Sequence, residues 1–241
     1  MTELFGMKFY DKPLNSIVNN LKEAILLGKK VRVYTPNVDH IINIKEKDSI
    51  FQQYREAEYI VADGWPVVAT AKLRKKVIHK ITGVDLMDEL LKISHEEKLN
   101  IFLLGATDET LKILKGNLIR DFNNIGNIEY HNGYFTKEEE SEIINIINKS
   151  NSNILFVGMG SPKQELWISD NIEKLNINVA VAIGGALKIY SNEIKRAPKL
   201  VQKIGMEWFY RFLKEPNRLF YRYFIKYPKF IKYFILEMRD K

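Results

Sequence analysis

One carboxylate in this sequence is placed for acid–base chemistry: Asp63 follows an apolar run and precedes a glycine. The apolar run, residues 59–62, is typical of a buried strand, so the carboxylate would lie directly at a strand end. There it could accept a proton from an attacking hydroxyl, bind a metal ion or cap the next helix. A metal is the least attractive of the three, because no Asp-x-Asp pair supplies a second carboxylate.

A second candidate is a glycine-containing run made of Gly158, Met159, Gly160, Ser161, Pro162, Lys163, Gln164 and Glu165. Its glycines let the backbone approach a ligand closely, and its proline suits the first turn of a helix. Free amides at a helix start favour a phosphate or diphosphate, while Gln164 and Glu165 could bind a sugar or a base. The glycine spacing of dinucleotide-binding proteins is absent, because Lys163 occupies the third glycine position. A tight turn without a ligand stays open as the alternative.

Polar residues also follow the strand-like run that ends at Thr35. Thr35 and Asn37 could hydrogen-bond a polyhydroxylated ligand. The alternative is that Asn37 caps a helix that runs through His40 to Ile44. A further run ends in Gly184 and Gly185.

The elements that must position these residues alternate along the chain. Apolar, β-rich runs occur at residues 30–35, 58–62, 100–104, 127–131, 153–157 and 178–183. Amphipathic helical patterns occupy residues 14–27, 84–98, 108–120 and 137–148. This alternation predicts an α/β fold of Rossmann-like type, with a mostly parallel sheet and helices on both faces. Ligands of such sheets bind outside the carboxyl ends of the strands, so the polar turns should line one rim.

Composition bounds the remaining choices. Apolar residues make up 46% of the 241 residues, enough for a substantial core. There are no cysteines, which excludes a disulfide scaffold and a cysteine nucleophile, and the four histidines lie far apart. We expect no metal and no cofactor. No signal segment precedes the body, and no apolar stretch reaches the length of a spanning helix, which favours a cytoplasmic protein.

Charge divides the chain near residue 194. Residues 195–241 carry 13 Lys or Arg against four acids, whereas the body, residues 1–194, has a net charge of −2. We therefore expect an α/β domain followed by a short, basic, aromatic helical appendage. Six of its bases are spaced three or four residues apart and would form one helical stripe: Arg211, Lys214, Arg218, Arg222, Lys226 and Lys229.

The appendage allows three interpretations. Basic side chains beside aromatic ones suit an anionic membrane surface. They also suit nucleic acid, although the net negative charge of the body and the lack of a nucleic-acid motif count against it. Third, the aromatic rings could pack on the body while the bases stay solvated. Pro216 and Pro228 should divide the segment into shorter helices.

Taken in order, the motifs form a set that resembles a known family. They are Thr35-Pro36-Asn37, Ala62-Asp63-Gly64, Thr82-Gly83-Val84-Asp85-Leu86, Gly133-Tyr134-Phe135, the run from Gly158 to Glu165, Gly184-Gly185, Arg196-Ala197-Pro198, Glu207-Trp208, Arg211, Glu215-Pro216, Arg218 and Arg222-Tyr223. Over nearly the whole chain the sequence resembles the WecG/TagA/CpsF glycosyltransferases (glycosyltransferase family 26). Its closest likeness in kind is to the teichoic-acid N-acetylmannosaminyltransferases.

The resemblance implies metal-independent, inverting transfer of a sugar, N-acetylmannosamine in the teichoic-acid members, from a UDP-sugar to a polyprenyl-diphosphate-linked GlcNAc. Asp63 matches the catalytic base. The resemblance also implies an appendage that sits on the inner face of the bacterial cell membrane, where Arg211, Arg218 and Arg222 would surround the acceptor diphosphate. Substrate binding is expected from Thr35, Asn37, Gly158, Gly160, Lys163, Gln164, Glu165, Gly184, Gly185 and Arg196.

Two positions depart from the family pattern. Leu187-Lys188 stands where Phe-Asp is usual, and Lys80-Ile81 where an arginine often precedes Thr-Gly. Lys188 reverses a charge near the rim, so another donor, UDP-glucose or a UDP-uronic acid, is an alternative. We expect no nucleic-acid partner, although a nucleic-acid-binding protein is the alternative from another class. Self-association into a homo-oligomer is left open.

Overall fold

The computed structural model describes residues 1–203 and 205–239, and only the backbone of Lys203 and Arg218. Its centre is an eight-stranded sheet in the order β1-β2-β4-β3-β8-β7-β5-β6. Strands β1 and β2 form an antiparallel hairpin, and all other pairs are parallel. The strand bounds are β1 Thr2–Leu4, β2 Met7–Phe9, β3 Val31–Tyr34, β4 Tyr59–Ile60, β5 Ile101–Gly105, β6 Ile128–His131, β7 Ile154–Gly158 and β8 Val179–Ala182.

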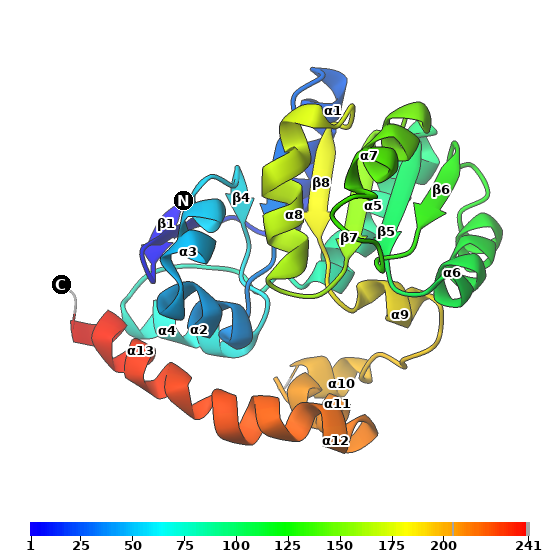
Figure 1. The fold of residues 1–241 in the computed structure, drawn as a ribbon. Helices are drawn as coiled ribbons and strands as arrows, with labels where there is room; N and C mark the ends of the chain where they lie inside the picture. The colour runs from blue at the N-terminus through cyan, green and yellow to red at the C-terminus, as the bar shows by residue number, and fades with distance from the viewer. Residues whose placement is uncertain (204, 240–241) are drawn as a thin grey trace.

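Helices cover both faces of the sheet, which confirms the predicted α/β class (Figure 1). Their bounds in the body are α1 Leu14–Leu26, α2 Val38–Glu46, α3 Asp48–Arg55, α4 Trp65–Leu73, α5 Gly83–Glu97, α6 Asp108–Asp121, α7 Glu140–Lys149, α8 Lys163–Asn171 and α9 Ala186–Tyr190, with the 3-10 turn η1 Ile172–Lys174 after α8. The six predicted strands and four predicted helices are all present, shifted by at most three residues at an end.

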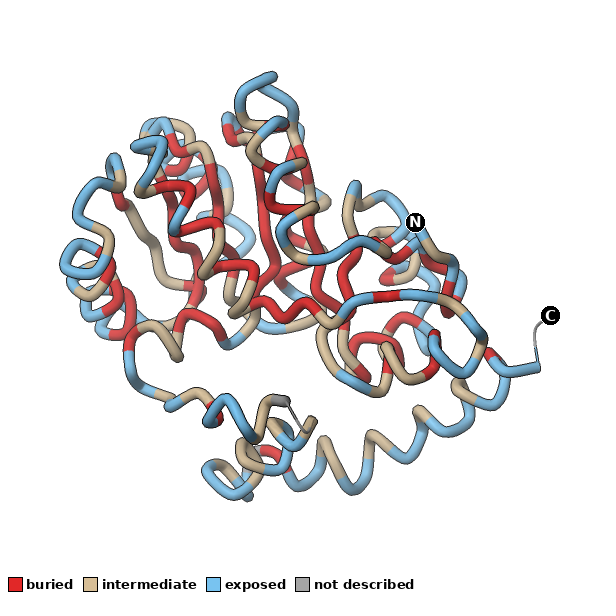
Figure 2. Tube along the Cα trace, turned by 180° about the vertical axis from the view of Figure 1, so that it is seen from behind, coloured by how far each residue is buried: buried red, intermediate tan, exposed pale blue. Residues whose placement is uncertain are grey.

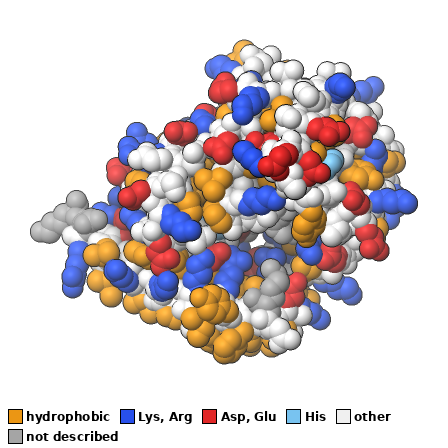
Figure 3. Space-filling view, viewed as in Figure 1, with side chains coloured by type: hydrophobic (Ala, Val, Ile, Leu, Met, Phe, Trp, Pro, Cys, Tyr) orange, Lys and Arg blue, Asp and Glu red, His pale blue; other side chains and the backbone are white. Residues whose placement is uncertain are grey.

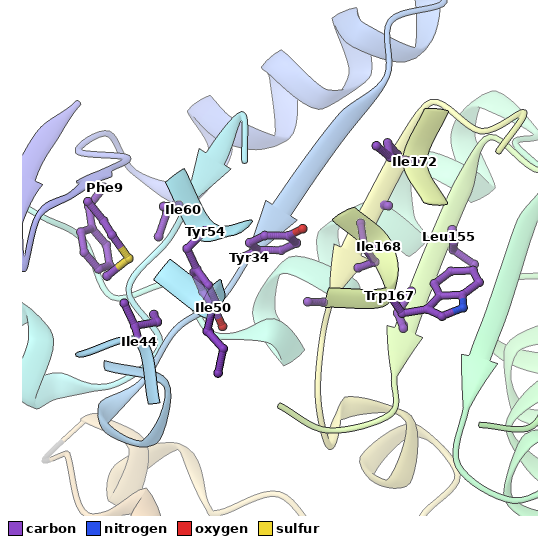
Figure 4. Close-up of a cluster of buried hydrophobic side chains, with 14 of the residues drawn as sticks. Phe9, Tyr34, Ile44, Ile50, Tyr54, Ile60, Leu155, Trp167, Ile168 and Ile172 are labelled. Carbon is purple, nitrogen blue, oxygen red and sulfur yellow. The ribbon is translucent and has the colours of Figure 1, made fainter. Parts of the chain in front are cut away.

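The central strands are apolar on both faces because each face meets a helical layer. In β5, Ile101 and Leu103 pack with α1, α5, α6 and α9, whereas Phe102 and Leu104 pack with the layer of α2, α3, α7 and α8. Figure 4 shows part of the second core, where Tyr34, Tyr54 and Trp167 come from β3, α3 and α8. The hydroxyl of Tyr34 donates to the carbonyl of Glu165 at 3.1 Å, which ties the first turn of α8 to β3.

The strand order opens a crevice between β3 and β8. After β3 the chain enters α2 on one face, and after β8 it enters α9 on the other, so the two connections diverge. In open α/β sheets this divergence leaves room for a ligand at the carboxyl ends of the strands.

The C-terminal appendage (residues 195–241) closes that end of the sheet. It comprises α10 Lys199–Lys203, α11 Glu207–Lys214, α12 Pro216–Phe220, the π-helical turn η2 Tyr221–Lys226 and α13 Pro228–Arg239. The two prolines each begin a helix, as predicted. Figure 1 shows the appendage crossing beneath the sheet and continuing along α2 toward β1.

Few residues of the appendage are buried where it packs on the body (Figure 2). Among its described residues from 199 onward, only Leu219 and Glu237 are buried. Glu237 accepts a hydrogen bond from the backbone N–H of Phe5 at 2.7 Å and pairs with Arg74. This buried carboxylate therefore fastens the end of α13 to the β1–β2 hairpin.

Candidate active site

A cavity of about 990 Å³ lies between the carboxyl ends of the strands and the appendage. In Figure 3 the surface is hollowed between the body and the C-terminal helices. Most of the residues predicted to act on substrate line it: Thr35, Asn37, Asp63, Gly158, Gly160, Lys163, Gln164, Gly184, Gly185, Arg211 and Arg222. Glu165 is buried behind the wall and Arg196 does not line the cavity. The side chain of Arg218 lies outside the described residues.

Asp63 lies three residues after the end of β4, next to Ala62, which forms an isolated parallel bridge with Lys80. Its backbone N–H donates to the carbonyl of Pro36 at 3.0 Å. No side-chain cap hydrogen bond is made at the start of α4, whose N-cap is Gly64, so the helix-cap alternative does not hold for Asp63. Desolvation in the cavity wall raises the pKa of Asp63 to about 6. The nearby side chains of His40, Arg211 and Lys80 act against this rise, and the charge of Glu207 adds to it. At neutral pH the carboxylate is thus ionised and has a raised proton affinity, as a general base requires.

Asn37 caps the helix, as one of the two interpretations of the sequence has it, and it also lies where a ligand could contact it. It is the N-cap of α2, where its side chain accepts from the backbone N–H of Asp39 at 3.0 Å, and it also lines the cavity. His40, at the third position of the helix, closes the capping box. Thr35 lies two residues earlier in the same wall, and its hydroxyl donates to the carbonyl of Ala182 at 2.9 Å, joining the ends of β3 and β8.

The glycines of the rim serve two different purposes. A Cβ on Gly158 would lie 2.6 Å from Leu187 and 2.8 Å from the carbonyl oxygen of Gly184, so this glycine is required for close packing within the protein. Gly160 and Gly184 instead have φ of +81° and +54° with open space around their Cβ positions. Their backbones turn in a conformation that suits glycine and leave the cavity wall uncovered.

The first turn of α8 contributes polar groups to the wall. The ammonium of Lys163 donates to the carbonyl of Gly133 at 2.9 Å and lies over the ring of Phe135. Gln164 is buried and donates to the carboxylate of Glu165 at 2.7 Å. Its amide oxygen has no hydrogen-bond partner among the described residues and is therefore available to a donor in the cavity.

The predicted basic stripe turns partly toward the body. Arg222 lies 3.6 Å from Asp39, and Lys226 pairs with the same carboxylate at 2.6 Å. Arg211 lines the cavity next to Gly185, and within the described part of the chain it has no ion-pair partner. An arginine with a free guanidinium in a cavity wall can bind an anionic group such as a diphosphate.

Comparisons with known proteins agree with this geometry. The model of the "Glycosyl transferase WecG/TagA/CpsF family" matches residues 2–241. The chain belongs to this family. It is 33% identical over 220 residues to N-acetylglucosaminyldiphosphoundecaprenol N-acetyl-beta-D-mannosaminyltransferases of Staphylococcus aureus strains MW2, NCTC 8325 and MRSA252. These matches cover 90% of this chain and 86% of each relative. The protein is a glycosyltransferase.

Within this glycosyltransferase, the departures from the family pattern have local structural partners. Lys188 pairs with Glu193 at 2.5 Å, and the other oxygen of Glu193 accepts from Thr110 at 2.9 Å. Because Glu193 compensates the charge of Lys188, the reversal at this position does not by itself favour a negatively charged sugar. Lys80 lines the cavity and lies 3.9 Å from Glu207.

Arg196 has a structural partner in this glycosyltransferase. It bonds the carboxylate of Asp85 at 2.5 Å and lies 3.8 Å from Glu207, which links the start of the appendage to α5 and α11. The sequence did not single out His40, Lys80 or Glu207 as site residues. They come together only because α2, the segment before α5 that contains Lys80, and α11 meet at the cavity, and no spacing in the sequence predicts this.

Neither a membrane-spanning helix nor a metal cluster is found in the described part of the chain. No helix there combines the length and the apolar character needed to cross a bilayer. Nor do the described His, Asp and Glu side chains gather anywhere in a group of three or more that could hold a metal ion.

Proposed function

We propose that this glycosyltransferase transfers N-acetylmannosamine from UDP-N-acetylmannosamine to a polyprenyl-diphosphate-linked GlcNAc, with inversion at the anomeric carbon. The observation that carries the proposal is that one cavity is lined by the carboxylate of Asp63, by glycine turns at strand ends and by arginines of the appendage. The names of the S. aureus relatives supply the sugar and the acceptor. Teichoic acid or a related surface polymer would be the product pathway.

Asp63 is proposed to take the proton from the acceptor hydroxyl as its oxygen attacks the anomeric carbon. The new glycosidic bond forms while the bond to the diphosphate of UDP breaks, and the leaving group carries away the electron pair. Arg211, which makes no ion pair among the described residues, would stabilise the negative charge that develops on the diphosphate. The uncovered backbone at Gly160 leads into α8, whose amide-rich start favours the same anion.

The direct test is UDP release from UDP-N-acetylmannosamine with a short-chain GlcNAc-diphosphate-lipid, for wild type and Asp63→Asn. We expect turnover by wild type and a fall of about 10²–10⁴-fold in the variant, the usual contribution of a positioned base. The matched control is Asp170→Asn, which removes an exposed carboxylate on the same protein. Full activity of Asp63→Asn would contradict the base assignment, whereas an inactive wild type would reject this donor and acceptor.

We further propose that the appendage holds the enzyme peripherally on the inner face of the bacterial membrane. Figure 3 shows hydrophobic side chains gathered along the edge formed by the appendage, with Lys and Arg beside them. Leu213, Phe220, Tyr221, Phe224 and Ile225 are each at least half exposed. Apolar side chains arranged on such a surface insert into the boundary between lipid headgroups and acyl chains.

Vesicle co-sedimentation tests this placement. Replacing Phe224 and Ile225 by serine should reduce binding to anionic vesicles, since both side chains are exposed and neither lines the cavity. Ile119→Ser on α6, which removes an equally exposed apolar side chain from the body, is the matched control. Unchanged vesicle binding of the double variant would argue against a membrane role for this surface.

A further inference from the structure

The side chain of Asn37 is held by its oxygen. Two donors meet the amide oxygen Oδ1: the backbone N–H of Asp39 at 3.0 Å and the guanidinium of Arg222 at 3.2 Å. The ring nitrogen Nδ1 of His40 accepts the backbone N–H of Asn37 at 3.2 Å and lies 2.8 Å from the same oxygen. Turning the amide over would place its NH₂ group against two permanent donors, the Asp39 amide and the arginine. The oxygen therefore faces α2 and the appendage.

The amide nitrogen is left for a ligand. Within the described residues the Asn37 NH₂ group has no hydrogen-bond partner, although the residue lines the cavity. The Cβ of Asn37 lies 3.9 Å from the Cβ position of Gly64, the neighbour of Asp63 in the chain. Two N–H donors thus belong to the same cavity wall as the carboxylate that is proposed to take the proton.

His40 is in turn braced from behind. Its ring is buried, and Nε2 lies 3.4 Å from the carboxylate of Glu165, which is only 1% exposed. Gln164 donates to the same carboxylate oxygen at 2.7 Å. The ring of His40 is thus held between Asn37 on one side and the buried carboxylate of Glu165 on the other.

We propose that His40 is a positioning residue for transfer: held by Glu165, it fixes Asn37 at the start of α2 so that the two N–H groups of the Asn37 amide bind an oxygen of the sugar at Asp63. The inference deepens the proposed function and rests on it for the identity of that sugar. His40 touches no substrate in this scheme and acts through Asn37. The chain of contacts runs from the start of α8 through α2 to the appendage, three segments that the fold brings to one wall.

A double-mutant cycle of His40→Ala and Asn37→Ser tests the coupling. Serine keeps the helix cap but lacks the amide donors. We expect each single variant to lower kcat about 10–100-fold with a smaller change in KM, as for a displaced substrate. The double variant should be little worse than Asn37→Ser alone, and exposed His79→Ala should match wild type. Losses that multiply in the double variant, or a folded His40→Ala protein with unchanged kcat, would overturn the proposal.

A second measurement needs no sugar. In protein labelled with ¹⁵N-asparagine, the side-chain NH₂ resonances of Asn37 are identified by their loss in Asn37→Ser. We expect His40→Ala to shift or broaden this pair, because Asn37 loses the ring that accepts its backbone N–H and lies against its amide oxygen. A pair that His40→Ala leaves unchanged would refute the positioning role. If wild type fails to use UDP-N-acetylmannosamine, the proposed function fails, while this spectrum still decides whether His40 holds Asn37.

Discussion

The substitution Asp63→Asn tests the site from two directions, because the structure makes the ionised carboxylate useful for chemistry and unfavourable for stability. Desolvation raises the pKa of Asp63 from 3.8 to about 6. Since one pKa unit corresponds to about 1.4 kcal/mol, the ionised form costs the folded state at most about 3 kcal/mol. Asp63 keeps some contact with solvent, so we expect a smaller figure, about 1–3 kcal/mol.

The sign of the pH dependence follows from the two pKa values. Between pH 3.8 and about 6 the folded protein retains a proton that the unfolded chain has lost. The free energy of unfolding of wild type therefore falls as the pH rises through this window. An asparagine side chain carries no charge, so the Asp63→Asn variant should gain about 1–3 kcal/mol over wild type at pH 8 and almost none at pH 4.

Urea unfolding at pH 4 and pH 8, followed by tryptophan fluorescence, measures both differences. Asp170→Asn on α8 is the control, since it removes a solvent-exposed charge. A variant that loses transfer and gains stability only at pH 8 would support a base held in a desolvated wall. An Asp63→Asn protein that is no more stable than wild type at pH 8, or whose stability difference is the same at both pH values, would refute the reasoning.

Three further perturbations test other parts of the structure. The kcat/KM for UDP release should fall about tenfold per pH unit below pH 6 as Asp63 takes up a proton, and a flat profile from pH 5 to 9 would contradict this. Glu237→Ala leaves the buried N–H of Phe5 without its acceptor, so the free energy of unfolding measured in urea should fall by about 1–3 kcal/mol. Trypsin should then cut α13 first, and unchanged cleavage would argue that Glu237 does not hold α13 to the hairpin. Gly158→Ala places a methyl group against Leu187 and should lower the free energy of unfolding by about 1–3 kcal/mol, seen as a lower Tm. An unchanged Tm would show that Leu187 and its neighbours can move to make room for the methyl group.

The parallel strands could be predicted because their physics is local. The central strands β5, β7 and β8 are runs of apolar residues, buried on both faces and ended by a turn. The hairpin Thr2–Leu4 and Met7–Phe9 could not, since strands of three residues are stabilised by their pairing, and β2 pairs with β4 at Phe9 and Ile60. Helix α3 was likewise missed, because its eight residues are mostly polar outside Ile50 and Tyr54.

The candidate site likewise contains residues that could be predicted from the sequence and residues that could not. Residues at strand ends, such as Asp63 and Asn37, could be placed from the sequence, because a parallel sheet brings its carboxyl ends to one edge. The bracing of His40 by Glu165 could not, since the residues are 125 positions apart and belong to helices that follow different strands. Arg196 matched a family motif, but in the folded chain it contacts Asp85 of α5 and Glu207 of α11 rather than the cavity. A family motif identifies the type of a residue, whereas the side chains that this residue contacts depend on how the chain packs.

The net positive charge of the appendage is larger than the charge that it can present to a membrane. Lys226 and Lys229 pair with Asp39 and Glu46 of α2 at 2.6 and 2.8 Å, and Arg222 also faces Asp39. A base near an anionic bilayer contributes about 1 kcal/mol, and a base already paired with a carboxylate contributes less. The charge that residues 195–241 can offer to lipid is thus smaller than their sequence suggests, while their exposed apolar side chains keep their full area. Binding to vesicles should accordingly depend more on these apolar residues than on ionic strength, and of the three inward bases Arg222 lines the cavity.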